Sequence, residues 1–363
     1  MLYVTGITGH TGMWFLDRLE RDGLAPLGCA GVRCAVRPET DASRLEASPL
    51  GIELARGSLE DEDFLARSMR GARTVLHIAS INLTPGVMRA ALACGAEWAV
   101  LVHTTGRFSK YKSASAGYIE IEEAALALRG RIGVTVLRPT MIYGSSRDRN
   151  MYKLVDYLHR HRVFPVFGDG RNLMQPVHAR DLGNAYYDAL AARERTFNRE
   201  YNLSGQSPIA YIDLVRTVSR ALGRRNLFVK VPLGVSILGA RLYNALTRRP
   251  IITVEQVLRM QEDKAFDWGD AARDFGYSPV SFEEGIAGEV REYLESRAGR
   301  RGAEARGQRE SRADDADGGI CGTRPGGGAE DSPHKQHVNA GGGKPTRGQR
   351  GDASSSGGGG LLK

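Results

Sequence analysis

The sequence predicts an α/β fold with a parallel, doubly wound sheet and a small C-terminal α/β lobe. Three observations lead to this prediction. Short apolar segments alternate with amphipathic segments as far as Pro139, a rhythm typical of βαβ units. Gly6, Gly9 and Gly12 stand three apart at the first junction between the two kinds of segment. After Pro139 the alternation becomes irregular, so the sheet domain is expected to end near residue 150.

The N-terminal elements are expected in the following order. A strand begins at Leu2 and leads through the glycine-rich turn into a helix whose apolar positions are Trp14, Phe15, Leu16 and Leu19. Further extended segments are expected at 32–37, 51–58, 74–80, 98–106 and 133–139, and helices at 61–71, 85–95 and 117–128. Right-handed crossovers would bring the carboxyl ends of the strands to one edge of the sheet, where ligands bind in such folds.

Composition divides the chain into three parts. Residues 1–150 are expected to form the sheet domain, and residues 151–295 a C-terminal lobe that is partly woven into the sheet. In the lobe, helices are expected at 151–162, 210–223 and 283–294, and extended segments at 175–181, 201–208 and 228–232. Residues 296–363 are rich in Gly, Arg, Asp and Ser and contain almost no apolar side chain. Such a segment cannot bury enough apolar surface to offset its ordering entropy, so it is expected to be disordered.

The charge distribution argues against a nucleic-acid partner. The net charge is +8, and the segment 296–363 holds 12 Lys and Arg against 8 Asp and Glu. Arginines there are interleaved with acids, and no aromatic residue is present for base stacking. The charge left for the first 295 residues is small for their length, and it predicts no binding of nucleic acid.

The cysteines and the apolar runs indicate a cytoplasmic protein. Cys29, Cys34, Cys94 and Cys321 show no metal-binding spacing, so core thiols and no metal site are expected. No apolar run reaches the roughly 18–20 residues that cross a bilayer. A strand that begins at Leu2 leaves no room for a signal peptide, which leads us to expect a cytoplasmic location.

The glycine triplet predicts a site for the pyrophosphate of a dinucleotide. Glycine suits the turn because the backbone must approach the phosphates closely and the helix must pack tightly on the strand. The helix N-terminus then offers free N–H groups and its positive dipole end. At the end of the second strand stands Arg37, where an acid would hold the ribose hydroxyls of NAD. A guanidinium can pair with a 2′-phosphate, so NADP is expected, with NAD as the alternative.

Five segments together carry a family resemblance. They are TGITGHTG at 5–12, HIAS at 77–80, HTTG at 103–106, LRPTMIYG at 137–144 and QPVHARDLGNA at 175–185. They resemble the short-chain dehydrogenase/reductase superfamily, in the extended or atypical branch of NAD-dependent epimerase/dehydratases, over roughly residues 2–294. The resemblance implies a Rossmann-type fold and a nicotinamide cofactor.

The resemblance also implies which residues hold the cofactor. The pyrophosphate contacts would be Gly6, Thr8, Gly9, His10, Thr11 and Gly12. The adenosine and ribose contacts would be Arg37, Ser58, Leu59, Ala79 and Ser80, and Pro139 and Ile142 would back the nicotinamide. Thr104 is also counted among the cofactor contacts, and Thr104 or Thr105 would take the position of the active-site hydroxyl. His178 and Asp181 match a His-x-x-Asp segment whose role in the family is more often structural than catalytic.

The expected catalytic residues are Tyr118 and Thr105. In the superfamily a tyrosine exchanges a proton with the substrate oxygen, and a lysine four residues later lowers the pKa of that tyrosine. Thr105 and Tyr118 have a suitable spacing, but the fourth residue after Tyr118 is Glu122. An anion there would raise the tyrosine pKa. The usual pair of tyrosine and lysine is therefore absent.

Two further departures concern the substrate. Nucleotide-sugar enzymes of this type carry an asparagine where this chain has Met141 and an arginine where it has Met174. The loss of both polar groups argues against a UDP-sugar and for a more apolar substrate. The apolar stretch 231–246 precedes Arg248 and Arg249. Packing of this stretch on the lobe is favoured over an interfacial membrane helix.

Two functions stay open from the sequence. The first is an NAD(P)-dependent oxidoreductase, or an epimerase/dehydratase-like enzyme, acting on a small hydroxy or keto compound. The second is a cofactor-binding sensor or assembly factor without turnover, which the missing lysine favours. A homodimer is compatible with both.

Overall fold

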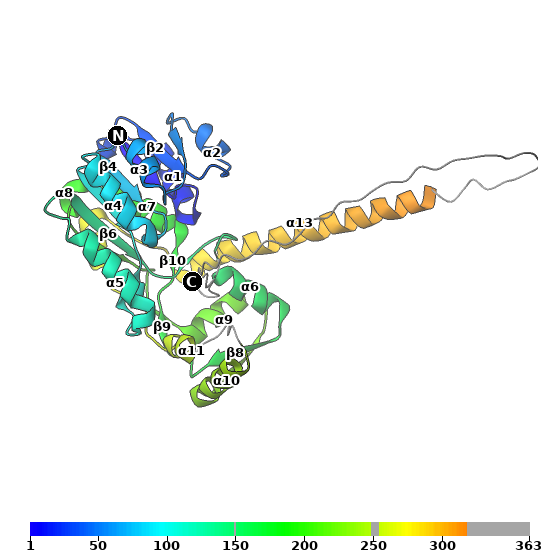
Figure 1. Ribbon diagram of the computed structural model, residues 1–363. Helices are drawn as coiled ribbons and strands as arrows, with labels where there is room; N and C mark the ends of the chain where they lie inside the picture. Colours follow the sequence, from blue (N-terminus) through cyan, green and yellow to red (C-terminus); the bar gives the residue numbers. More distant parts are fainter. Residues whose placement is uncertain (149, 248–253, 318–363) are drawn as a thin grey trace, which may run out of the picture. The chain divides into compact units, whose positions relative to one another are not determined.

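The computed structural model describes residues 1–148, 150–247 and 254–317, and a parallel sheet of seven strands lies at its centre (Figure 1). The strand order is β11-β6-β5-β4-β1-β2-β3. The strands are β1 (Leu2–Thr5), β2 (Val32–Val36), β3 (Glu53–Arg56), β4 (Thr74–His77), β5 (Trp98–Val102), β6 (Gly133–Pro139) and β11 (Glu200–Leu203). The order reverses at β1, which pairs with β2 on one side and β4 on the other. This switch point is where ligands bind in doubly wound sheets.

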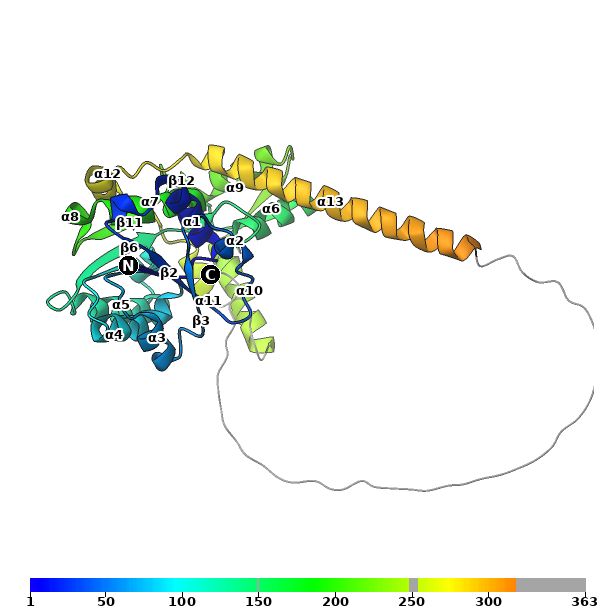
Figure 2. The same ribbon diagram turned by 90° about the horizontal axis from the view of Figure 1, so that it is seen from above.

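Helices cover both faces of the sheet, as Figure 2 shows from above. One face carries α1 (His10–Asp22), α2 (Ser43–Glu46), α7 (Ala179–Ala191) and α12 (Gly269–Phe275). The other carries α3 (Glu62–Ser68), α4 (Thr84–Ala93) and α5 (Lys112–Leu126). Successive side chains of a strand point to opposite faces, so Leu76 joins the first core and Val75 the second. The predicted doubly wound α/β fold is confirmed.

A third apolar core holds the C-terminal lobe together. It lies between α6 (Met151–Arg160), α9 (Tyr211–Ala221) and the first part of α13 (Phe282–Asp317). Short two-stranded sheets pair β7 (Ile142–Tyr143) with β10 (Val177–His178), β9 (Leu173–Met174) with β12 (Ile209–Ala210), and β8 (Val163–Phe167) with β13 (Leu227–Val231). The remaining elements are α8 (Arg193–Thr196), α10 (Leu233–Leu246), α11 (Val254–Arg259) and the 3₁₀ turns η1 (Ala25–Leu27), η2 (Ile81–Leu83) and η3 (Thr105–Phe108).

The chain returns to the sheet after it has entered the lobe. β11 pairs with β6 at the edge of the seven-stranded sheet, and α7 packs against α1 on its face. Gly183 on α7 permits this contact, because a Cβ there would lie 2.5 Å from Trp14 Cβ. The sheet domain and the lobe are thus interleaved in sequence, and residues Met1–Glu295 form one compact unit.

Two segments differ from their predicted state. Residues 296–317 continue α13, where the composition predicted disorder; the Ala, Arg, Glu and Gln of this stretch favour helix without any need to pack. The rest of the predicted disordered segment, 318–363, lies outside the described residues. Helix α5 begins at Lys112 rather than near residue 117. Ser and Gly residues in its first turns lower helix propensity and hid this start.

The apolar stretch 231–246 was expected to pack on the lobe; α10 contacts α11, and part of its apolar surface is exposed. The stretch forms the end of β13 and the helix α10, in which Val235 and Leu238 are 59% and 58% exposed. Among the described residues, no helix is both long and apolar enough to cross a bilayer.

Candidate cofactor and active site

The turn between β1 and α1 brings two backbone segments closer than any side chain allows. Gly6 has a φ of +76°, and a Cβ on it would lie 2.6 Å from the nitrogen of Ala79. A Cβ on Gly12 would lie 2.4 Å from the carbonyl oxygens of both Gly6 and Ile7. Only glycine fits at these two positions. The turn therefore packs backbone against backbone, with no side chain at Gly6 or Gly12.

The N-terminus of α1 is free to bind an anion. Gly9 is the N-cap residue and provides no side-chain acceptor for the first N–H groups of this 13-residue helix. His10 Nε2 is buried and has no hydrogen-bond partner among the described residues. Arg147 donates from Nη1 to the carbonyl oxygen of Thr8 at 3.2 Å. A diphosphate would suit this place for three reasons: the glycines leave the backbone without Cβ atoms, the imidazole nitrogen of His10 has no partner among the described residues, and Arg147 supplies a positive charge.

Not every residue expected at the pyrophosphate faces it. Thr11 is 6% exposed, and its hydroxyl accepts a hydrogen bond from Tyr186 on α7 at 3.4 Å. Its side chain therefore joins α1 to α7, and only its backbone N–H belongs to the helix N-terminus. Thr8 is half-buried and contributes its carbonyl oxygen to Arg147.

The expected adenosine contacts lie at the carboxyl ends of β2, β3 and β4. Arg37 directly follows β2, its side chain is 77% exposed, and its Nε lies 3.5 Å from Glu39 Oε1. Arg33, on the same strand, is held by the carbonyl oxygens of Ser68 and Arg70 at 2.7 and 2.8 Å. Arg33 is therefore occupied, whereas Arg37 can reach a ligand.

The other contacts expected there are small or apolar. Ser58 follows β3, and its hydroxyl accepts from the nitrogen of Glu60 at 3.2 Å. Leu59 packs partly against the second core. Ala79 and Ser80 follow β4, and the Ala79 backbone lies against Gly6. The sheet thus brings the predicted ribose residues to the same edge as the glycine turn.

The hydroxyl groups of the HTTG segment both have partners. Thr105 is 8% exposed and donates to the carbonyl oxygen of Pro139 at 3.2 Å. Thr104 accepts from the nitrogen of Gly106 at 3.0 Å. A Cβ on Gly106 would lie 3.2 Å from both Thr104 Oγ1 and Tyr118 Cε2. The half-buried Tyr118 ring therefore lies on the turn that carries the two threonines.

The two residues expected behind the nicotinamide flank the same edge. Pro139 ends β6 and offers its carbonyl to Thr105. Ile142, in β7, packs partly against the first core. Pro139 therefore lies beside the turn that carries the two threonines.

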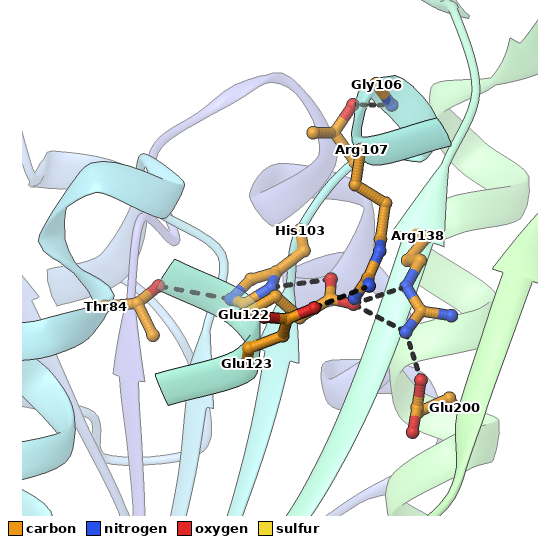
Figure 3. A network of polar contacts seen from close by, with 9 residues as sticks. Thr84, His103, Gly106, Arg107, Glu122, Glu123, Arg138 and Glu200 are labelled. Carbon is orange, nitrogen blue, oxygen red and sulfur yellow. Dashed lines mark hydrogen bonds and ion pairs between the residues drawn. The ribbon is translucent and has the colours of Figure 1, made fainter. Parts of the chain in front are cut away.

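Glu122 is the centre of a buried ionic network, drawn in Figure 3. Its side chain is fully buried on α5. Arg138 donates to Glu122 Oε1 from Nε at 2.9 Å and from Nη2 at 2.6 Å. Arg107 also pairs with Oε1, and His103 Nδ1 lies 3.0 Å from Oε2. Arg138 is shared with Glu200 on β11.

The hydrogen-bonding chemistry of the network assigns the state of His103. Burial, and then Arg138 and Arg107, lower the pKa of His103 to about 3, so it is neutral. A carboxylate can only accept, so Nδ1 carries the proton and donates to Glu122. Nε2 then accepts from the hydroxyl of Thr84 at 3.2 Å. His103 is a satisfied core histidine, and Glu122 is neutralised by two guanidinium groups.

A second buried acidic group lies beside Gly144, directly after β7, and sequence reasoning missed it. Glu289 on α13 is 1% exposed and accepts from the nitrogen of Gly144 at 2.8 Å, while its Oε1 has no partner among the described residues. Burial, followed by the charge of Asp148, raises the pKa of Glu289 to about 8. Asp148 caps α6 through the nitrogens of Asn150, Met151 and Tyr152. The signal was present, because residue 289 falls on the apolar face shared by Ile286 and Val290.

Residues 261–268 form a loop that packs on the segment after Thr105. Glu262 is 9% exposed and accepts from Ser109 Oγ at 2.8 Å and from the nitrogen of Lys110 at 2.9 Å. The rings of Phe266 and Phe108 lie 5.4 Å apart. Lys264 pairs through its backbone with β9, and burial lowers its pKa. The loop therefore brings a lysine into the described lobe that no motif indicated.

The two methionines that replace polar family residues belong to the third core. Met174 is 9% exposed within this core, and Met141 packs partly against it. His178 and Asp181, which match the His-x-x-Asp segment, both accept hydrogen bonds from backbone N–H groups. His178 accepts from the nitrogen of Arg180 at 3.1 Å as the cap of α7, and Asp181 accepts from the nitrogen of Val280 at 2.9 Å.

Comparison with curated proteins finds distant relatives. No family model matches the chain. The chain is 22% identical to short-chain dehydrogenase/reductase family 42E member 1 of Danio rerio, in a match that covers 65% of this chain and 76% of that one. It is 25% identical to the Mus musculus protein of the same name, over 48% of this chain and 47% of that one.

Comparison with solved structures finds the same architecture. The crystal structure of gox2253 has a TM-score of 0.67 and 20% identity, and the match covers 82% of this chain and 98% of that one. DesIV, a dTDP-glucose 4,6-dehydratase from Streptomyces venezuelae with NAD and TYD bound, has a TM-score of 0.62 at 20% identity and the same coverage. These similarities establish the fold, since identities this low carry no information on the reaction.

Proposed function

We propose that the chain, which is similar in sequence to a short-chain dehydrogenase/reductase and in fold to epimerase/dehydratase structures, belongs to the extended branch of that superfamily, binds a nicotinamide dinucleotide and acts as an oxidoreductase or epimerase/dehydratase-like enzyme. The observation that carries the proposal is the β1–α1 turn. Gly6 and Gly12 exclude side chains there, and the N-terminus of α1 is uncapped. When bound, the nicotinamide supplies hydride transfer, and every other requirement falls on this chain's residues.

NADP is the proposed cofactor. Arg37 is exposed at the carboxyl end of β2, and its partner Glu39 lies at 3.5 Å in an ion pair open to solvent. Exposed pairs of this kind contribute little, so the guanidinium can turn to a 2′-phosphate at small cost. Ser58, at the end of the next strand, adds no negative charge that would repel the phosphate.

Tyr118 is the proposed acid/base. Its ring lies on Gly106, beside Thr104 and one residue from Thr105. In this role its hydroxyl would exchange a proton with the substrate oxygen. Thr105, whose O–H donates to the carbonyl oxygen of Pro139, would orient a substrate hydroxyl by accepting a hydrogen bond from it. The substrate is proposed to be a small hydroxy or keto compound rather than a UDP-sugar, because Met141 and Met174 lie in or against the apolar core.

Gly9→Asp tests cofactor binding; its Cβ would lie 3.0 Å from the carbonyl oxygen of Gly6, a contact that a small backbone shift relieves. An aspartate at an N-cap accepts hydrogen bonds from the first turn and stabilises a helix. The same carboxylate would occupy and repel the diphosphate. In calorimetric titrations with NADPH and NADH, the wild type should bind, and Gly9→Asp should lose binding while its melting temperature is kept or raised.

A matched control carries the same change at the amino end of a neighbouring strand, β2. Gly31 lies just before β2, and a Cβ on it would meet no atom within 4 Å. Gly31→Asp should bind the cofactor as the wild type does. Unchanged affinity in Gly9→Asp, with binding in the wild type, would place the cofactor elsewhere and defeat the proposal.

The second candidate function is a cofactor-binding protein without turnover. It is favoured by one observation: the residue four after Tyr118 is a carboxylate engaged by Arg138, Arg107 and His103. Position 122 therefore supplies no cation beside Tyr118. Tight NADPH binding with no cofactor oxidation across aldehydes, ketosteroids, quinones and keto-sugars would favour this function over the enzyme.

A further inference from the structure

Helix α10 presents apolar side chains to solvent. Val235 and Leu238, one helical turn apart, are 59% and 58% exposed, and Tyr243 is 37% exposed. Residues three apart lie on the same face of a helix. The described residues therefore leave one face of α10 apolar and uncovered.

The strand pair that leads into α10 has the same property. Leu227 on β13 pairs with Val163 on β8, so their side chains lie side by side; they are 62% and 47% exposed. Val229 lies two residues further along the same face and is 43% exposed. The other face carries Phe164 and Phe228, which pack against the third core. Val235, Leu238 and Tyr243 of α10 are called here the apolar patch.

The stretch of sequence that contains β13 and α10 carries charge of one sign. No Asp or Glu occurs between Asp213 and Glu255. The Lys and Arg residues in the same stretch are Arg216, Arg220, Arg224, Arg225, Lys230, Arg241, Arg248 and Arg249. Arg224, Arg225, Lys230 and Arg241 are exposed in the structure. Arg248 and Arg249 lie outside the described residues.

We propose that the apolar patch docks on the surface of an anionic lipid bilayer, with α10 in the interface. Apolar side chains on one face and cations at its margin are the combination that binds helices to anionic membranes. With 14 residues, α10 is about 21 Å long, short of the roughly 30 Å of hydrocarbon that a spanning helix crosses. A protein partner with an apolar surface would account for the patch but gives no reason for a carboxylate-free stretch.

Vesicle sedimentation with the full chain tests the proposal. The protein should bind vesicles of phosphatidylcholine mixed with phosphatidylglycerol at low salt, and should bind pure phosphatidylcholine vesicles much less. High salt should weaken binding to the anionic vesicles, because the attraction between the cations and the lipid is screened. The variant Val235→Ser/Leu238→Ser should bind anionic vesicles at least about tenfold more weakly than the wild type, since it removes two large apolar side chains from the contact.

Leu294→Ser is the matched control. Leu294 is also an exposed apolar residue, at 38%, but lies on α13 outside the patch, and its replacement should leave vesicle binding unchanged. The segment 296–363 carries a net positive charge and is present in every variant, so any binding it contributes cancels in the comparison. Circular dichroism melting of each variant separates lost binding from lost folding, because Val235 and Leu238 are exposed and their replacement should leave the melting temperature unchanged.

Two results would overturn the proposal. Equal binding of the double variant and the wild type would show that the patch does not touch the lipid. If instead the wild type ignores vesicles and elutes as a dimer that Val235→Ser/Leu238→Ser converts to monomer, the patch joins two copies of this chain. The proposal stands apart from the proposed function, because vesicle binding is measured without cofactor or substrate.

Discussion

Arg138 on β6 holds Glu122 on α5 with two hydrogen bonds, of 2.9 Å from Nε and 2.6 Å from Nη2, in a setting where the Glu122 side chain has no exposure to solvent. The pair connects the helix that carries Tyr118 to the strand that ends at Pro139. Arg107 and His103 complete the shell around the carboxylate. Glu122 is therefore a structural residue of the sheet edge, and it stands where the family places a lysine.

Replacing Glu122 with Gln should destabilise the protein strongly. The amide cannot neutralise the buried guanidinium of Arg138, and a buried ion pair that loses one partner typically costs about 3–5 kcal/mol. Denaturant unfolding measures this loss. Glu120→Gln, an exposed position on the same helix, should change stability by less than about 0.5 kcal/mol.

Glu122→Lys restores the family spacing but should not restore its chemistry. The ammonium group would lie between Arg107 and Arg138, where like charges repel without solvent to screen them. We expect the variant to be poorly folded, with an unfolding midpoint below that of Glu122→Gln. A well-folded Glu122→Lys protein with raised turnover would contradict the structural role assigned to Glu122.

Tyr118→Phe should abolish turnover with any substrate that the wild type converts, because the hydroxyl that exchanges the proton is lost. Cofactor affinity and melting temperature should stay as in the wild type. Tyr111→Phe is the control, since Tyr111 lies at the start of the same helix and has no proposed part in the reaction. An unchanged kcat in Tyr118→Phe would remove Tyr118 from the mechanism.

Arg37→Asp should weaken NADPH binding much more than NADH binding. Loss of a charge-assisted pair costs about 1.5–3 kcal/mol, which corresponds to at least about a tenfold rise in the Kd for NADPH. Parallel titrations with the two cofactors measure the ratio. An equal loss for both would show that Arg37 does not contact the 2′-phosphate.

Glu289 should make stability fall as pH rises from about 4.5 to about 8. In the folded protein burial raises the pKa of Glu289 from 4.5 to about 8, so between these values the folded state keeps a proton that the unfolded state releases. The slope from this one group is at most about 1.4 kcal/mol per pH unit. Glu289→Gln should flatten this part of the pH profile, and Glu295→Gln, an exposed position on α13, should leave the profile unchanged.

Truncation after residue 298 should leave melting temperature and NADPH affinity unchanged. The last core residues are Ile286, Val290 and Tyr293, all on the part of α13 within the compact unit Met1–Glu295. Segments that bury nothing contribute little to a folded core. A clear drop in melting temperature would mean that part of 299–363 packs on the protein.

The local patterns of the chain were sufficient for the sheet and for the β1–α1 turn. The alternation of apolar and amphipathic segments fits β1 through β6, and β6 occupies Gly133–Pro139 as predicted. The three glycines indicated the β1–α1 turn, because the steric need for Gly6 and Gly12 is local and recurs wherever a strand and helix meet this closely. Because β1 pairs in parallel with β2 and β4, Arg37 and Ala79 lie near that turn regardless of the chemistry of their side chains.

Partners that lie far apart in the sequence were decided only in the tertiary structure. Glu122 reads as one more acid in an amphipathic helix, and its role depends on Arg107, Arg138 and Glu200, which three other elements bring to it. Glu289 meets Gly144 across 145 positions of sequence, and α10 is apolar in composition whether it is covered or exposed. The spacing of apolar residues along the sequence identifies which face of a helix or strand is apolar, because that face is defined by residues close together in the sequence. Which group faces that side, and whether a buried charge is neutralised there, depends on packing between distant segments, and no local pattern encodes it.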